Sequence, residues 1–130
     1  MTVSIVIRTY NEERHLGDVL SAIGSQQCEK KWEVVLVDSG STDSTTDIAR
    51  SHGCRIVTIA KQDFTFGRSL NVGCEAANGD ILVFLSGHCI PTDRQWLARL
   101  IEPVRTGKAS YCYGRQIGGA SSRFSECQIF

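Results

Sequence analysis

The chain has 130 residues, a length typical of a single domain, and we expect one domain over residues 1–130. Its 14 lysines and arginines balance its 14 aspartates and glutamates, which argues against nucleic acid as a partner because nucleic-acid-binding proteins present a basic surface. No apolar run approaches the ~18 residues of a membrane-spanning helix, and the residues after Met1 lack a secretion signal, so we expect a cytoplasmic protein without a membrane span.

The first half of the chain alternates strand and helix patterns. The β-branched run at residues 3–7 predicts a strand buried on both faces, and apolar residues at helical spacing predict a helix over 16–23. A second buried strand is predicted at 33–37. It ends in a polar loop at 38–43, whose hydroxyls can cap a helix predicted over 45–51.

The second half continues the same alternation. A third strand is predicted at 55–59 and a helical face at 70–77, which ends at an Asn-Gly pair. A fourth strand at 81–85, a fourth helical stripe at 97–104 and a fifth strand at 109–113 follow.

This order of elements predicts an α/β fold with three layers, α/β/α, around a mainly parallel sheet. Such sheets bind ligands beyond the carboxyl ends of their strands. We therefore expect the loops that follow Ile7, Val37 and Leu85 to converge on one site.

The loop after the first strand offers a hydroxyl, an aromatic ring and a carboxylate, at Thr9, Tyr10 and Glu12. A ring can stack on a nucleobase, and a carboxylate can accept its N–H groups. Alternatively, Thr9 and Glu12 form a capping box for the following helix.

Asp38 ends the second buried strand and precedes Ser39 and Gly40. A carboxylate here suits hydrogen bonding to a nucleoside, and the glycine permits a close backbone approach. The alternative for Asp38 is a loop cap. Asp43 lies close to the next helix, and we interpret it as a turn or cap residue.

Five segments together resemble the opening motifs of inverting glycosyltransferases of family 2, over nearly the whole chain. These segments are Val3–Glu13, Glu33–Asp43, Gly67–Gly73, Ala77–Asp80 and Leu85–Pro91. The resemblance implies a GT-A type nucleotide-binding sheet that is truncated before the acceptor half.

The resemblance also implies a function in polysaccharide biosynthesis. The donor is a UDP-, dTDP- or GDP-linked sugar, and the acceptor is a saccharide or a lipid-linked saccharide, which would place the protein at the inner membrane face. The nucleotide-sugar-binding residues that it implies are Thr9, Tyr10, Glu12, Asp38, Ser39, Arg68, Asn71, Gly87 and His88. Arg68 could alternatively be a solvated helix start. The catalytic base is expected beyond Phe130, so we expect this chain alone to be inactive.

The sequence departs from the family where an Asp-x-Asp metal motif is usual. Ser86, Gly87, His88 and Cys89 stand there without a carboxylate, which Mg²⁺ prefers as a ligand. His88 could bind Mn²⁺, neutralise a diphosphate as an imidazolium without any metal, or hydrogen-bond to backbone. Cys89 could be a soft metal ligand, but we interpret it as a packing residue.

The six cysteines form no Cys-x-x-Cys pair, and we expect all six to be free thiols instead of a disulfide framework. Residues 113–116 and Glu126 resemble rhamnosyltransferase-like members of the family and favour a deoxyhexose donor such as dTDP-rhamnose; Arg115 could equally be a surface residue.

Two other functions stay open. One is a non-catalytic nucleotide-sugar-binding module with a degenerate transferase fold. The other is a nucleotidyltransferase, although its basic glycine-rich loop is absent after the first strand. A dehydrogenase of the Rossmann type is excluded because Gly-x-Gly-x-x-Gly is absent there.

Overall fold

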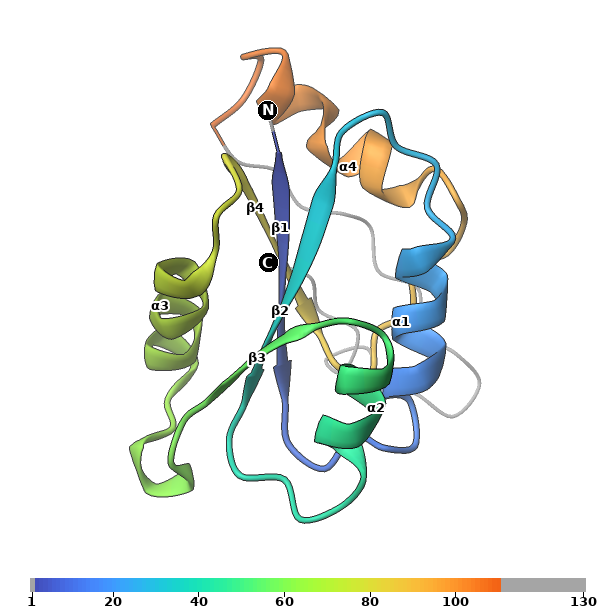
Figure 1. Cartoon of the computed structure of the whole chain (residues 1–130). Helices are drawn as coiled ribbons and strands as arrows, with labels where there is room; N and C mark the ends of the chain where they lie inside the picture. Colours follow the sequence, from blue (N-terminus) through green and yellow to red (C-terminus); the bar gives the residue numbers. More distant parts are fainter. Residues whose placement is uncertain (1, 111–130) are drawn as a thin grey trace.

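The computed structural model describes residues 2–110, with four parallel strands in the order β3-β2-β1-β4 (Figure 1). The strands are β1 (Val3–Thr9), β2 (Trp32–Asp38), β3 (Arg55–Thr58) and β4 (Ile81–Ser86). The helices are α1 (Leu16–Gly24), α2 (Thr45–Ser51), α3 (Phe66–Ala76) and α4 (Trp96–Arg105), with a 3-10 turn η1 (Lys61–Asp63).

The helices cover the sheet on two faces, which confirms the three-layer α/β/α fold. Helices α1, α2 and α4 lie on one side and α3 on the other (Figure 1). Alternate residues of β1 face the two sides: Val3, Ile5 and Ile7 join the larger core, whereas Val6 joins the smaller core beneath α3. Strand β1 is therefore buried on both faces, as its continuous β-branched run predicts.

A glycine lets α3 approach the sheet. A Cβ atom built on Gly73 would lie 2.3 Å from Val6 Cγ1 and 3.2 Å from Val37 Cγ2. Both distances are shorter than van der Waals contact, so the helix can pack at this depth only without a side chain at this position.

The first four predicted strands and the four predicted helices are confirmed, and three of the four strands extend further than expected. Strands β1, β2 and β4 continue to Thr9, Asp38 and Ser86, so the candidate residues Thr9 and Asp38 are paired strand ends rather than loop residues. Of the expected fifth strand, residues 109 and 110 lie outside any strand, and 111–113 lie outside the described residues.

The described cysteines, Cys28, Cys54, Cys74 and Cys89, are free. Cys112 and Cys127 lie outside the described residues. Among residues 2–110, no helix is long and apolar enough to cross a membrane.

The amino ends of the strands are held by a polar network around Glu33. Its carboxylate accepts hydrogen bonds from Ser4 Oγ at 2.5 Å and from Asn78 N at 2.6 Å, and it pairs with Arg55. Gly79 N donates to Ser4 Oγ at 2.8 Å. The network ties β1, β2 and β3 to the turn that leads into β4.

Candidate functional site

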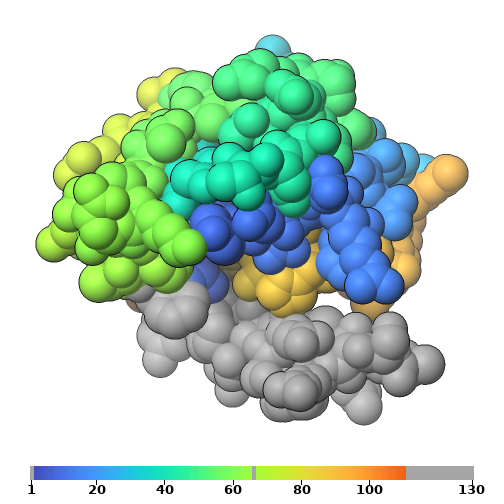
Figure 2. Space-filling model, turned by 90° about the horizontal axis from the view of Figure 1, so that it is seen from below, coloured from blue at the N-terminus to red at the C-terminus, as the bar shows by residue number. Residues whose placement is uncertain are grey.

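The loops after β1, β2 and β4 meet at the carboxyl end of the sheet. Figure 2 views this end, with the loop after β1 between the loop after β2 and the segment after β4. The loops meet because of the strand register, in which Thr9 is paired with Asp38 and Arg8 with Ser86. The convergence expected from the sequence is therefore present.

Asp38 organises the loop after β2. Its side chain is buried, and its Oδ1 accepts hydrogen bonds from Thr9 Oγ1 at 2.8 Å and Ser41 Oγ at 2.5 Å. Its Oδ2 accepts from Gly40 N at 3.1 Å and Ser41 N at 2.8 Å. A carboxylate has about four acceptor sites. A ligand N–H group would therefore have to displace one of these protein donors.

The capping box expected as an alternative at Thr9 and Glu12 is wrong. Thr9 belongs to β1, and its hydroxyl donates to Asp38 instead of accepting from a helical N–H group. Helix α1 begins only at Leu16, without a side-chain cap at His15. The spacing of Thr9 and Glu12 matched a capping box, but the strand extended through the first of its positions.

Ser39 joins the ends of β1 and β2. Its backbone N donates to Thr9 O at 3.1 Å, and its buried hydroxyl donates to the same oxygen at 3.3 Å. Ser39 therefore lies in the site, but both of its hydrogen-bond donors are directed to the backbone oxygen of Thr9.

Asn11 connects the first two loops, and sequence reasoning missed it. Its backbone is in the left-handed region, at φ 51°, which asparagine tolerates better than most residues. Asn11 N donates to Ser41 Oγ at 2.8 Å, and Asn11 Oδ1 accepts from Thr42 N at 2.8 Å. The available sequence signal was an asparagine within the loop predicted after residue 7, since asparagine tolerates the left-handed region.

Further hydrogen bonds tie the same two loops together closer to α2. Glu12 N donates to Thr45 Oγ1 at 2.8 Å, and Glu13 Oε2 accepts from Ser44 N at 3.0 Å. Asp43 accepts from Thr45 N at 2.9 Å and Glu13 N at 3.3 Å, which confirms it as a turn residue. Desolvation raises the pKa of Asp43, but hydrogen bonds from Thr45 and Glu13 outweigh it and lower the pKa overall.

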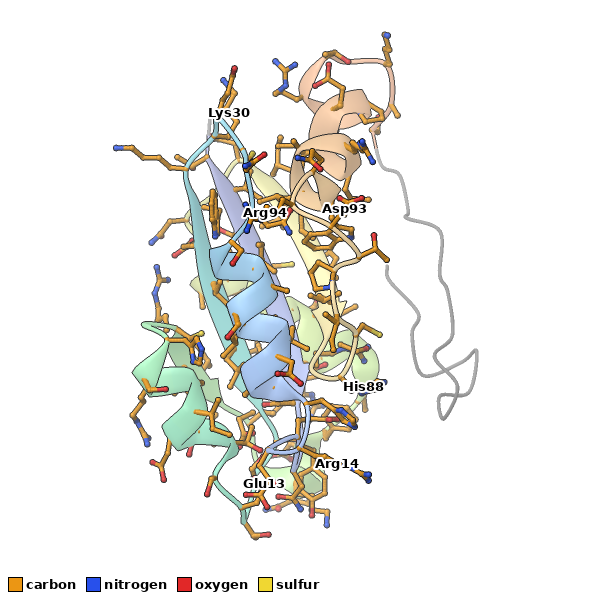
Figure 3. All side chains as sticks on the ribbon, turned by 90° about the vertical axis from the view of Figure 1, so that its right-hand side faces the viewer. Glu13, Arg14, Lys30, His88, Asp93 and Arg94 are labelled. Carbon is orange, nitrogen blue, oxygen red and sulfur yellow. The ribbon has the colours of Figure 1, made fainter. Side chains whose placement is uncertain are left out.

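The loop after β4 brings His88 to Glu12. His88 Nδ1 lies 3.3 Å from Glu12 Oε1, and both side chains are mostly buried. His88 Nε2 is buried and has no hydrogen-bond partner among residues 2–110. Figure 3 shows His88 at the same end of the sheet as Glu13 and Arg14. Glu12 therefore supplies, from another loop, a carboxylate next to the segment that has none.

Gly87 makes this contact sterically possible. It is buried, and a Cβ atom there would lie 2.9 Å from Thr9 Cγ2 and 3.1 Å from Glu12 Cγ. Its N–H group donates to Arg8 O at 3.1 Å. Gly87 thus keeps the β4 loop against the end of β1.

Residues 2–110 contain no cluster of three or more His, Cys, Asp or Glu side chains that could hold a metal ion. Within this range, Glu12 is the carboxylate that pairs with His88. Cys89 is part of the hydrophobic core, as its interpretation as a packing residue predicts.

Arg68 and Asn71 lie in the first two turns of α3, and both are exposed. Thr65 Oγ1 caps this helix by accepting from Arg68 N at 3.0 Å. Arg68 Nη1 donates to Asp63 O at 3.0 Å and lies 3.7 Å from Asp63 Oδ1. The arginine is therefore at a solvated helix start, the alternative expected for it, with a carboxylate beside its charge.

Tyr10 has a partner that the sequence did not indicate. Lys61 Nζ donates to Tyr10 Oη at 2.7 Å and lies 4.6 Å from the centre of the Tyr10 ring. Gly40, at φ 95°, passes beside Lys61; a Cβ atom there would lie 3.9 Å from Lys61 Cβ. The sequence signal available for this contact was a basic residue two positions after the predicted third strand.

The family model described as "Glycosyl transferase family 2" matches residues 4–126. The glycosyltransferase AglE of Haloferax volcanii is 37% identical over 108 residues, which are 78% of this chain and 35% of AglE.

Two solved structures share the fold. TarS of S. aureus in complex with UDP-GlcNAc matches with a TM-score of 0.82 and 21% identity, over 95% of this chain and 36% of TarS. Glucosyl-3-phosphoglycerate synthase of Mycobacterium tuberculosis, in complex with Mn²⁺, UDP and glucosyl-3-phosphoglycerate, has a TM-score of 0.68 at 28% identity. It covers 79% of this chain and 39% of that chain. These likenesses confirm the GT-A type fold. The chain spans little more than a third of the length of each of these relatives.

Proposed function

The chain belongs to glycosyltransferase family 2, and from this premise we propose that it forms the donor-binding part of an enzyme that transfers a sugar from a nucleoside diphosphate. The observation that carries the proposal is the meeting of Glu12 and His88, from two different loops, at the carboxyl end of the sheet. Ligands of open parallel sheets bind at this end.

Each side chain has a distinct task in this proposal. The exposed ring of Tyr10 provides a face on which the nucleobase stacks. Thr9, Asp38 and Ser39 shape the backbone beneath the nucleoside through the hydrogen bonds that they share. Arg68 and Asn71 line the α3 side of the site.

His88 and Glu12 fit a divalent cation that is held jointly with the diphosphate. Histidine that binds a metal usually donates its other N–H group to a carboxylate, and Glu12 stands beside Nδ1 in this manner. The other ring nitrogen, Nε2, which has no hydrogen-bond partner among the described residues, is then the atom that binds the metal. Mn²⁺ accepts imidazole more readily than Mg²⁺ does, so we propose Mn²⁺. The cation would neutralise the charge of the leaving nucleoside diphosphate.

We further propose that transfer proceeds with inversion onto a saccharide or lipid-linked acceptor, in the cytoplasm or at the inner membrane face. Inversion requires a base that deprotonates the acceptor hydroxyl. It also requires a site that holds this hydroxyl in line with the anomeric carbon. Asp93 and Glu126, two carboxylates toward the end of the sequence, do not match a family base, and we propose a base that follows Phe130. The preference for a dTDP-linked deoxyhexose rests on residues 113–116 and Glu126, which lie outside the described residues.

Calorimetric titration of the chain with UDP, dTDP and GDP, each with and without Mn²⁺, tests this proposal. We expect one nucleotide to bind, and Mn²⁺ to tighten its binding. His88→Ala should abolish the effect of Mn²⁺, and Glu12→Gln should weaken Mn²⁺ binding by about 10–100-fold, the usual effect of removing the partner of a ligating histidine.

His52→Ala is the matched control, because it removes an exposed imidazole at the end of α2. It should leave both affinities unchanged. If no nucleotide binds to the folded chain, the proposed function is wrong. If a nucleotide binds equally with and without Mn²⁺ and His88→Ala weakens both, then His88 contacts the phosphates without a metal.

One observation favours a non-catalytic binding module as a second candidate. The described residues contain no group of three or more His, Cys, Asp or Glu side chains that could hold a cation. Slow hydrolysis of a bound nucleotide sugar, followed by release of the free sugar, would exclude this candidate, whereas donor binding without hydrolysis or transfer under any metal would support it.

A further inference from the structure

The ammonium of Lys61 lies beside Tyr10 at the candidate site, and no carboxylate of residues 2–110 forms an ion pair with it. Its hydrogen bond goes to the neutral Tyr10 hydroxyl, at 2.7 Å. None of the ion pairs formed within residues 2–110 includes Lys61. The positive charge of Lys61 is therefore uncompensated in this part of the chain.

Arg68 is the contrasting cation on the same side of the sheet. Its guanidinium lies 3.7 Å from Asp63 Oδ1, and it donates to Asp63 O at 3.0 Å. Binding an anion through Arg68 would require a phosphate to compete with this carboxylate. Among residues 2–110, no carboxylate pairs with the Lys61 ammonium and would compete with a phosphate for it.

We propose that Lys61 is the side chain that binds the donor's diphosphate on the β3 side of the site. This inference rests on the proposed function, because it assumes that a nucleoside diphosphate occupies the carboxyl end of the sheet. It assigns a role to a residue that the sequence motifs do not single out, and it moves the phosphate-binding role away from Arg68.

The chemistry of the ammonium supports this assignment. A lysine ammonium has three N–H donors on a flexible stem, and the Tyr10 hydroxyl accepts one of them. Two donors remain for phosphate oxygens. Hydrogen bonds between charged groups are shorter and stronger than neutral ones, so a phosphate is a better partner than the phenol.

The position of Lys61 beside the Tyr10 ring gives the contact a second consequence. With its ammonium 2.7 Å from Tyr10 Oη and 4.6 Å from the ring centre, Lys61 lies at the hydroxyl end of the ring and not over its centre. A nucleobase can therefore stack on the Tyr10 ring while the Lys61 ammonium binds a phosphate.

The experiment compares uridine, UMP and UDP, or the corresponding thymidine or guanosine series if the chain prefers that base, in buffer without metal. Titrations use the wild-type chain and Lys61→Met, which removes the charge but keeps an unbranched side chain. Arg68→Met is the comparison at the same end of the sheet, because it tests the phosphate-binding role that the resemblance implies for this arginine. Lys30→Met is the control at the opposite end, where Figure 3 shows Lys30. Thermal melts check that each variant folds.

We expect Lys61→Met to weaken diphosphate binding about tenfold, which corresponds to ~1.4 kcal/mol, and to leave nucleoside affinity within about twofold. The loss should shrink in high salt, because exposed charges are screened. Lys30→Met should change the diphosphate affinity by less than about twofold, and Arg68→Met should weaken it less than Lys61→Met does.

An equal loss for nucleoside and diphosphate would overturn the proposal, since Lys61 would then act on the base or through Tyr10. An unchanged diphosphate affinity in Lys61→Met, with normal binding by the wild type, would overturn this inference alone. Failure of the folded wild-type chain to bind any member of the series would overturn the proposed function with it.

Discussion

Both oxygens of Asp38 are used inside the protein. The carboxylate is 2% exposed and accepts hydrogen bonds from Thr9, Gly40 and Ser41. It is thus a buried acceptor on which the course of the loop after β2 depends, whatever else it contacts. Loss of such an acceptor leaves several donors without a partner in a place that water does not reach.

We expect Asp38→Asn to lower the free energy of unfolding by about 2–3 kcal/mol, because its amide group presents N–H atoms to donors that need an acceptor. Urea unfolding followed by circular dichroism measures this. Asp63→Asn, at an exposed carboxylate, should change the stability by less than about 0.5 kcal/mol. A similar small change in both variants would show that the hydrogen bonds of Asp38 add little.

Residue contacts of this kind could not be predicted from the sequence. The hydrogen bonds from Thr9 to Asp38, from Asn11 to Ser41 and from Lys61 to Tyr10 join residues 29, 30 and 51 positions apart. No local pattern records such pairs, since they depend on which loops the sheet register brings together. The capping box failed for the same reason: Thr9 found a better partner across the strands.

The elements themselves were predictable because each has a local cause. β-branched runs marked β1 and β2, and helical spacing of apolar residues marked α1 and α4. Their ends were less predictable, since pairing with a neighbour extends a strand beyond its apolar run. The distance of α3 from the sheet depends on the absence of a side chain at Gly73. A sequence pattern shows only that this residue is small.

We expect Gly73→Ala to destabilise the protein by about 1–3 kcal/mol through overpacking against Val6 and Val37. Gly67, in the first turn of the same helix, is the matched control, since a Cβ there meets nothing within 4 Å. Gly67→Ala should be neutral or stabilise by up to about 1 kcal/mol through helix propensity. Thermal melts of both variants provide the measurement, and equal destabilisation of the two would contradict the packing argument.

Across the whole molecule, the two ends of the sheet have different tasks. The carboxyl ends carry the candidate site, whereas the network around Glu33 fixes the amino ends. Desolvation raises the pKa of Glu33, but hydrogen bonds from Ser4, Asn78 and Arg55 together with the charge of Arg55 outweigh it, so the pKa is lowered overall. The network is therefore tied to the ionised form of Glu33.

A lowered carboxyl pKa gives stability that is present above the pKa of the unfolded chain and is lost as pH falls through the lowered pKa of the folded chain. We expect the wild type to lose stability in this acidic range and Glu33→Gln to depend less on pH there, while being less stable at neutral pH. Urea unfolding at a series of pH values measures both. Glu75→Gln, an exposed position on α3, should keep the wild-type pH dependence. A parallel pH dependence for Glu33→Gln and the wild type would contradict this role.

The hydrogen bonds between the loops after β1 and β2 join protein groups to one another. They include those of Asn11 to Ser41 and Thr42 and the one between Glu13 and Ser44. The conformational entropy of these loops is therefore lost when the chain folds. A ligand that arrives later meets a surface that is already shaped and does not have to order it. Amide hydrogens of residues 11–13 and 41–45 should accordingly exchange slowly even before any nucleotide is added.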